Sequence, residues 1–359
     1  MIALFSTTAG VCSLLIVAVL SSAHAGAGVH LAARACSRAQ VGAHSPGPPS
    51  PAQGPGAPAR SRPGIPGTRA ARASPLRWRR RGTVHADDEE AAVHGVVTSV
   101  ERLTPSLVRV VLGGDGLSGF WPDAGETPDT DAYVNLALPP AGADYGPVFD
   151  PAEVKETHPR ELQPARRRYT VRAWDPDALL LTLDFVVHGD EGAAGALAAS
   201  ARPGDVLVLT GPGSGYRPDP SADVHLLVGD ESAVPAIAVA LESLPAGARA
   251  VVRLVCDGPD HELALVTRAD ADVAWVHRTP EDPTPLPAAV AALARPEGRV
   301  HAFVHGEADE VREIRRHLLG TWGLARSDMS CSPYWRRTMT DEAWRAVKRE
   351  YVKAMDADA

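Results

Sequence analysis

Cysteine is scarce in this sequence. Its 359 residues contain four cysteines, and no two of them are separated by only two residues. Iron–sulfur clusters and structural zinc sites usually depend on such closely spaced pairs, so we expect neither, and we expect no protein-bound metal. With so few cysteines no disulfide framework is predicted, and a reducing compartment fits this usage. The four positions are Cys12, Cys36, Cys256 and Cys331.

Positive charge is also scarce over most of the chain. Ten of the 36 Lys and Arg residues, and none of the 44 Asp and Glu residues, lie before Asp87. From Asp87 onward 26 basic residues face 44 acidic ones, which gives a formal charge of −18. Proteins that bind nucleic acids need a basic face for phosphate contacts, so this composition argues against a nucleic-acid partner. Only a local basic cluster could attract an anionic small molecule.

The apolar run near the N-terminus is too short to cross a bilayer, and we expect no stable membrane association. Residues 11–20 form this run, and Ala23-His24-Ala25 after it has the form of a signal-peptidase site, but no Lys or Arg precedes it. Residues 45–75 are rich in Pro, Gly, Ala and Arg and cannot bury a core. Residues 1–91 are therefore predicted to be a disordered tail, or a signal and linker. Two interpretations stay open, an exported protein or a cytoplasmic enzyme preceded by upstream sequence, and we favour the second.

From Ala92 the pattern changes to short β-rich runs separated by turns, without a long helix. Six such runs predict a small antiparallel barrel over residues 92–218, and residues 141–164 are predicted to be a polar loop within it. The six runs are residues 94–100, 106–112, 132–138, 169–174, 179–187 and 205–210.

After Ala222, runs typical of strands alternate with runs typical of helices. This predicts a Rossmann-like parallel sheet with helices on both faces, over residues 222–359. Such folds bind ligands at the carboxyl ends of their strands, where Gly229-Asp230-Glu231-Ser232 lies. This segment lacks the pattern Gly-x-Gly-x-x-Gly, and Ser232 is expected to cap the next helix. The predicted strands are residues 224–228, 250–255, 273–276 and 300–304, and the predicted helices are residues 234–244, 288–293, 309–319 and 341–355.

Three segments stand out by their order and spacing. Arg167-Arg168-Tyr169-Thr170 lies on a predicted strand, residues 184–192 join a strand to a glycine-containing turn, and residues 229–236 join a strand to a helix. Alternation along the first strand sends Arg167 and Tyr169 to one face, and Arg168 and Thr170 to the other.

Together with Leu103-Thr104-Pro105, Trp174-Asp175 and Tyr334-Trp335-Arg336-Arg337, these segments resemble one family. It is the siderophore-interacting proteins, flavin-dependent ferric-siderophore reductases of the ferredoxin-reductase superfamily. The resemblance implies an antiparallel FAD-binding barrel followed by an NAD(P)-binding domain, with NADH or NADPH as electron donor and a ferric siderophore as substrate. We expect a monomer. Two alternatives stay open: another flavin reductase of this superfamily, or a siderophore-binding module with a degenerate flavin site.

The resemblance assigns roles residue by residue. Arg167 would contact the FAD pyrophosphate, whose oxygens match the guanidinium fork. Tyr169 would lie on the isoalloxazine ring and Thr170 would bond its reactive edge, so both are candidate catalytic residues. Main-chain N–H groups at a helix start after the second segment would also hold the pyrophosphate. The candidate cofactor-binding residues are Arg167, Tyr169, Thr170, Val171, Asp184, His188, Gly189, Gly192, Ala193, Ala194, Gly195, Gly229, Asp230, Glu231 and Ser232.

Some positions depart from the family's pattern. Gly195 replaces a usual Ser or Thr, and Leu197 replaces an aromatic residue, so a phosphate contact and a packing surface are lost. Asn135 replaces a usual Lys, and with it the usual substrate contact. Pro333 and Thr338 replace glycines. The remaining candidates for contact with an anionic siderophore are Arg172, Arg336 and Arg337.

Two further points have alternative interpretations. Residues 256–262, after the second strand of the sheet, contain no Lys or Arg, which mildly favours NADH over NADPH. Tyr216, and likewise Tyr334 and Trp335, would either contact the flavin or pack within the protein.

Overall fold

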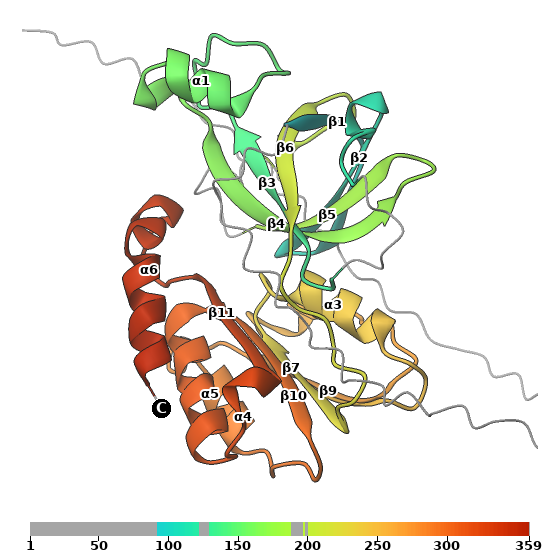
Figure 1. The fold of residues 1–359 in the computed structure, drawn as a ribbon, viewed down its shortest axis with the longest axis vertical. Coiled ribbons are helices and arrows are strands. Elements are labelled where there is room, and N and C mark those ends of the chain that lie inside the picture. Colours follow the sequence, from blue (N-terminus) through green and yellow to red (C-terminus); the bar gives the residue numbers. More distant parts are fainter. Residues whose placement is uncertain (1–91, 122–128, 188–196, 198–199, 359) are drawn as a thin grey trace, which may run out of the picture. The chain divides into compact units, whose positions relative to one another are not determined.

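The computed structural model describes residues 92–121, 129–187, 197 and 200–358 of the chain. They form an antiparallel barrel followed by a parallel sheet with helices on both faces, as the sequence predicts (Figure 1). The barrel and the sheet belong to one compact unit. Among the described residues, no helix is both long enough and apolar enough to cross a membrane.

Six strands close the barrel in the order β1-β2-β5-β4-β3-β6, and all their pairings are antiparallel. Alternation explains the closure, because every second side chain of a strand faces a common apolar core. On β3, Val134, Leu136 and Leu138 lie in this core, whereas Asn135 lies on the outer face. The strands are β1 (Val93–Thr104), β2 (Leu107–Gly113), β3 (Tyr133–Leu138), β4 (Ala165–Asp175), β5 (Leu180–Val186) and β6 (Val206–Gly213).

Strand β4 shows the alternation that its sequence predicts. Arg167 and Tyr169 lie opposite core residues of β3, whereas Arg168 and Thr170 lie opposite residues of its outer face. The pairing of β4 with β5 shifts by one residue just after Val171, so simple alternation ends there.

One helix differs from the sequence prediction. Residues 141–164, expected to be a loop, contain α1 (Pro151–Thr157). Its start signals are present, because Pro151 lies in the first turn and Asp150 accepts a 2.8 Å hydrogen bond from the main-chain nitrogen of Ala152. The helix is short and buries only Val154, so it produces no apolar periodicity that sequence analysis could detect.

The second half contains a five-stranded sheet of order β11-β10-β7-β8-β9 in which all pairings are parallel. Its central strands are apolar because both faces are covered, by α3 on one side and by α4 and α5 on the other (Figure 1). Helix α3 also contacts β4 of the barrel. The elements are β7 (Val224–Gly229), α3 (Val234–Ser243), β8 (Arg249–Cys256), β9 (Asp270–His277), α4 (Leu286–Ala291), β10 (Val300–Glu307), α5 (Ala308–Gly320), β11 (Met329–Trp335) and α6 (Asp341–Ala357).

Candidate functional site

Strand β4 is tied to two helices of the α/β half. The Arg167 guanidinium forms ion pairs with Asp341 and Glu342 at the start of α6, at 3.0 and 2.6 Å. Further along the strand, Arg172 donates to Glu242 of α3, with one N–O distance of 3.0 Å. The strand that carries the predicted flavin motif therefore lies where the barrel meets the α/β half.

Tyr169 and Thr170 carry hydroxyl groups that have no hydrogen-bond partner in the described part of the chain. The Tyr169 ring packs on Phe185 with ring centroids 4.1 Å apart, and burial raises the pKa of its hydroxyl. Thr170 is buried, with 8% of its surface exposed. Both hydroxyls are thus suited to bond a ligand placed beside β4.

Two other predicted cofactor-binding residues have roles within the barrel. Val171 lies in the barrel core. Asp184 accepts two hydrogen bonds from Arg109, at 2.7 and 2.8 Å, and its side chain is almost completely buried. Both side chains are therefore occupied by contacts inside the protein.

The predicted pyrophosphate-binding turn lies outside the described residues. It comprises His188, Gly189, Gly192, Ala193, Ala194 and Gly195. Leu197, a little further on, is helical and packs against the barrel core. Leucine therefore supplies packing at the position where the resemblance implies an aromatic residue.

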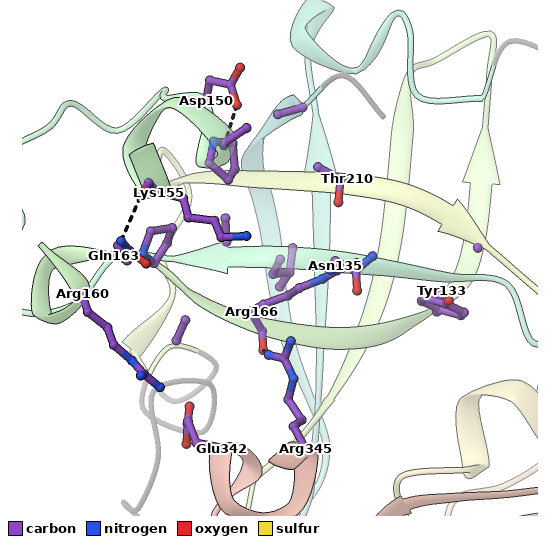
Figure 2. A pocket seen from close by; sticks show the side chains of 18 of the residues that line it. Tyr133, Asn135, Asp150, Lys155, Arg160, Gln163, Arg166, Thr210, Glu342 and Arg345 are labelled. Carbon is purple, nitrogen blue, oxygen red and sulfur yellow. Dashed lines mark hydrogen bonds between the residues drawn. The ribbon is translucent and has the colours of Figure 1, made fainter. Parts of the chain in front are cut away.

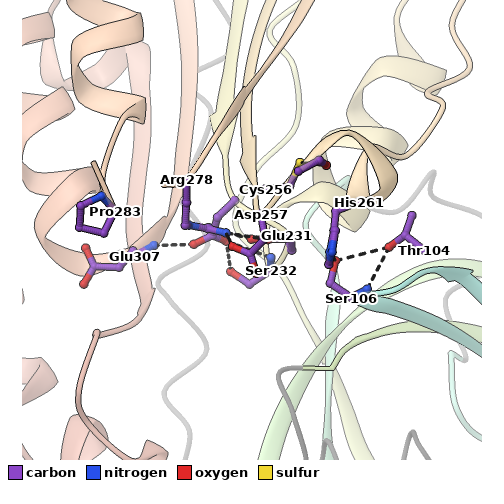
Figure 3. A network of polar contacts seen from close by, with 12 residues as sticks. Thr104, Ser106, Glu231, Ser232, Cys256, Asp257, His261, Arg278, Pro283 and Glu307 are labelled. Carbon is purple, nitrogen blue, oxygen red and sulfur yellow. Dashed lines mark hydrogen bonds and ion pairs between the residues drawn. The ribbon is translucent and has the colours of Figure 1, made fainter. Parts of the chain in front are cut away.

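The loop after β7 is held together by its own carboxylates. Asp230 is buried and accepts hydrogen bonds from the main-chain nitrogens of Ser232 and Glu307, both at 2.9 Å, and from Nε1 of Trp335 at 2.7 Å. Glu231 accepts two bonds from Arg278, at 2.7 and 2.8 Å (Figure 3). Burial raises the pKa of Asp230, and the charge of Glu231 adds to the rise. Asp230 joins the end of β7 to the end of its neighbour β10, Glu231 joins it to the end of β9, and both carboxylates are already bonded within the protein.

Ser232 does not cap α3, contrary to the sequence-based expectation. The helix begins after Ala233 without a side-chain cap, and the Ser232 hydroxyl donates instead to Asp230, since a carboxylate is a strong acceptor. On β10, Gly306 faces the same carboxylate with φ of 140°, and a Cβ there would lie 2.7 Å from Asp230 Oδ2. The close approach of β10 to this loop therefore requires glycine at position 306.

The three arginines predicted for substrate contact are each paired with a carboxylate. Besides Arg172, Arg336 pairs with Asp309 at 3.2 Å, and Arg337 pairs with Glu310 at 3.1 Å. Burial, together with the charge of Asp230, raises the pKa of Glu310 to about 7.

Tyr216 and Tyr334, which were expected either to contact the flavin or to pack within the protein, both pack within the α/β half. Tyr216 is buried and stacks on His301, with ring centroids 5.2 Å apart. Tyr334 meets His305 edge-on at 5.0 Å. The indole of Trp335, as described above, is hydrogen-bonded. These contacts support the packing interpretation.

A cavity of about 860 Å³ lies on the outer face of β3, β4 and β6, with α1 and α6 along its sides (Figure 2). Four basic residues line it, and two carboxylates, those of Asp150 and Glu342. Asn135 is also in the wall and accepts a 3.3 Å hydrogen bond from Nε of Arg168. Sequence analysis missed the basic residues, because α1 was not predicted and they come from distant segments. They are Lys155, Arg160, Arg166 and Arg345.

Comparison with known families matches both the barrel and the α/β part of the chain. Residues 96–216 match a model described as the siderophore-interacting FAD-binding domain. Residues 222–338 match a model described as siderophore-interacting protein.

Individual proteins show the same similarity. An uncharacterised protein of Mycobacterium tuberculosis is 40% identical over 272 residues, which cover 72% of this chain and 95% of the relative. The ferric vibriobactin reductase ViuB of Vibrio cholerae is 34% identical over 248 residues, which cover 67% of this chain and 88% of the relative. The crystal structure of the siderophore-interacting protein SipS from Aeromonas hydrophila matches with a TM-score of 0.63 at 28% identity, covering 74% of this chain and 99% of that one.

Proposed function

The chain belongs to the siderophore-interacting protein family, and we propose that it is an NAD(P)H-dependent ferric-siderophore reductase that uses FAD. One observation carries the proposal beyond family membership. The strand with Arg167, Tyr169 and Thr170 is tied to α3 and α6 of the α/β half by ion pairs. A flavin on this strand would lie beside the part of the protein that a nicotinamide donor would occupy, which hydride transfer requires.

The side chains of β4 fit FAD. The hydroxyls of Tyr169 and Thr170 are without partners in the described part of the chain and can bond the polar groups of a flavin. Arg167 is paired, but its partners Asp341 and Glu342 are 36% and 62% exposed. The Arg167 side chain is 15% exposed, but because its partner carboxylates are open to solvent these ion pairs contribute little, and Arg167 can exchange them for a pyrophosphate.

Each part of the chain then has a task. Residues 92–218 would bind and orient FAD, and residues 222–359 would bind NADH or NADPH at the carboxyl edge of the sheet. There the carboxylates of Asp230 and Glu231, which are hydrogen-bonded within the protein, would hold the loop after β7 in place. The main chain of this loop and the groups beside it would then contact the nicotinamide donor. Bound FAD supplies the conversion of the two electrons of a hydride into single electrons, which Fe(III) accepts. A cytoplasmic location follows from this proposal, because the donor is intracellular.

A spectroscopic experiment under anaerobic conditions tests the proposal. The purified protein should be yellow, release FAD and not FMN on denaturation, and lose its flavin absorbance on addition of NADH or NADPH. A ferric siderophore added next should restore the absorbance, while a chromogenic Fe(II) chelator reports the released iron. Protein that cannot be reconstituted with FAD would instead be the binding module with a degenerate flavin site. A flavin that the donor reduces but ferric siderophores do not reoxidise would indicate another flavin reductase.

A further inference from the structure

We infer that the electron donor is NADH and not NADPH, and that Asp257 and Glu262 make this selection at the carboxyl edge of the sheet. The inference rests on the proposed function and names the donor for that function. The two donors differ only by a phosphate on the 2′ oxygen of the adenosine ribose. An Arg near that oxygen accommodates the phosphate, whereas a carboxylate bonds the unmodified hydroxyl.

The loop after β8 lies where this oxygen would be recognised. In α/β folds that bind dinucleotides, the adenosine ribose meets the residues that follow the second strand of the sheet. Strand β8 is the second strand of this sheet in chain order, and residues 257–262 follow its end at Cys256. On the neighbouring strand β9, His277 pairs with Cys256, so the residues after both strands lie at the same edge.

Arg278, directly after β9, brings a guanidinium to this edge, but its charge is already neutralised. It donates to Glu231 at 2.7 and 2.8 Å and to Asp257 at 2.9 Å (Figure 3). The side chains of Glu231 and Arg278 are only 1% and 11% exposed, so separating this pair would leave a buried charge without its partner. Two carboxylates thus face one guanidinium, and Arg278 is not available to a phosphate.

Asp257 and Glu262 are carboxylates that a ligand can reach. Their side chains are 51% and 38% exposed. Glu262 is positioned from the neighbouring strand by a 2.8 Å hydrogen bond with Nε2 of His277. Carboxylate oxygens accept hydrogen bonds from ribose hydroxyls, but they repel a phosphate placed at the same point.

A cleft of about 390 Å³ beside Glu262 suits the adenine end of the donor. Glu262 alone is charged among the described residues that line it, and the half-buried Trp275 supplies an aromatic ring on which a purine can stack. A base in this cleft would bring its ribose close to Glu262. The lining residues are Pro259, Glu262, Leu263, Ala264 and Leu265 after β8, and Val273 and Trp275 on β9.

The loop that carries the two carboxylates is also held in place. Its His261 ring is hydrogen-bonded to the Ser106 hydroxyl of the barrel at 3.0 Å (Figure 3). At the start of the loop, the Cys256 thiol donates to the main-chain oxygen of Gly258 at 3.3 Å. Moving the loop away from a 2′-phosphate would break such contacts, so the repulsion would act against NADPH binding.

The test compares the FAD-loaded full-length protein with the double variant Asp257→Asn/Glu262→Gln. This variant removes two negative charges, nearly keeps the side-chain sizes and leaves an amide oxygen to accept from Arg278. ADP-ribose and its 2′-phosphate serve as redox-inactive probes whose affinities calorimetry measures. Rapid-mixing absorbance gives the rates of flavin reduction by NADH and NADPH at low and at high ionic strength.

Two further variants complete the experiment. Asp270→Asn is the matched control, because Asp270 is exposed at the opposite end of β9 and does not line the cleft. Trp275→Leu tests the cleft separately, since leucine keeps an apolar side chain and removes the stacking surface.

We expect the unmodified protein to bind ADP-ribose at least about tenfold more tightly than its 2′-phosphate, and to prefer NADH by a similar factor at low salt. High salt should reduce the preference, because screening weakens the repulsion. The double variant should lower the preference at least about fivefold, and Asp270→Asn should change it less than about twofold. Trp275→Leu should weaken both probes to a similar degree, by about tenfold, and leave the preference unchanged.

Three results would overturn the inference. One is equal affinity for the two probes, or tighter binding of the 2′-phosphate, in the unmodified protein. Another is an unchanged preference in the double variant. The third is unchanged affinity for both probes in Trp275→Leu, which would place the base outside the cleft and away from Glu262. Failure of the proposed function looks different, because then neither NADH nor NADPH reduces the flavin of the unmodified protein.

Discussion

Arg167 on β4 and Glu342 on α6 are joined by a bond of 2.6 Å between a guanidinium nitrogen and a carboxylate oxygen, although 175 residues separate them. The guanidinium that the family resemblance assigns to a pyrophosphate thus already holds an anionic group of the chain itself. The charge-assisted bond to Arg167 lowers the pKa of Glu342, so the carboxylate is ionised in the physiological range. A pyrophosphate and the start of α6 would compete for one side chain.

The first prediction concerns Arg167. Arg167→Ala should weaken FAD binding by about 1.5–3 kcal/mol, the usual contribution of a hydrogen bond to a charged group. Glu342→Gln should leave FAD binding unchanged or tighten it by less than about 1 kcal/mol, because it removes only an exposed competitor. Flavin fluorescence titration of the apoprotein measures both. Equal weakening by the two variants would mean that the ion pair supports the site and does not compete with it.

The second prediction concerns the Tyr169 hydroxyl. Tyr169→Phe should weaken FAD binding by about 0.5–1.5 kcal/mol and leave the free energy of unfolding of the apoprotein nearly unchanged, since this hydroxyl has no partner in the described residues. Tyr145→Phe is the matched control, because the Tyr145 hydroxyl donates to the main-chain oxygen of Leu162 at 2.9 Å. That variant should lower stability and spare FAD affinity. If Tyr169→Phe behaved like the control, its hydroxyl would serve the fold alone.

The third prediction concerns Asp230. Asp230→Asn places an amide NH₂ among donors, the Trp335 indole and two main-chain N–H groups, so at least one buried bond is lost. The free energy of unfolding should fall by about 1–3 kcal/mol in urea titrations. Glu313→Gln on the exposed side of α5 should change it by less than about 0.5 kcal/mol. Unaltered stability of Asp230→Asn would mean that the hydrogen bonds of this carboxylate do not stabilise the fold.

The fourth prediction concerns the pH dependence of stability. Burial raises the pKa of Glu310 from 4.5 to about 7, so between these values the folded state binds more protons than the unfolded state. The contribution of Glu310 to stability is therefore most favourable below about pH 4.5 and is lost as pH rises to about 7, by on the order of 2–3 kcal/mol. Glu310→Gln should remove this loss. Urea unfolding of both proteins at pH 5 and pH 8 measures it, and a constant difference between the two proteins would contradict the assigned pKa.

The order of elements could be predicted from the sequence because its signals are local. Alternating apolar residues on β3 indicate a strand with one buried face, and on β4 Arg167 and Tyr169 share one face as expected from alternation. The helix α1 escaped prediction because it buries a single residue, and its capping signals at Asp150 and Pro151 are common in loops too. The expected cap at Ser232 was wrong because a carboxylate two residues away accepts its hydroxyl, and propensity carries no information on such competition.

The sequence by itself determined the two-part architecture and the family, and it singled out the strand proposed to hold FAD, since these depend on periodicity and on motifs of a few consecutive residues. Only the tertiary structure decided which charged groups are available. Arg172, Arg336 and Arg337 look alike in sequence to Lys155 and Arg345, but folding places a carboxylate beside each of the first three. Folding also brings α1 and α6, nearly two hundred residues apart, to the sides of one cavity. Ion pairing depends on distances of a few ångströms between remote segments, and only the packed fold sets those distances.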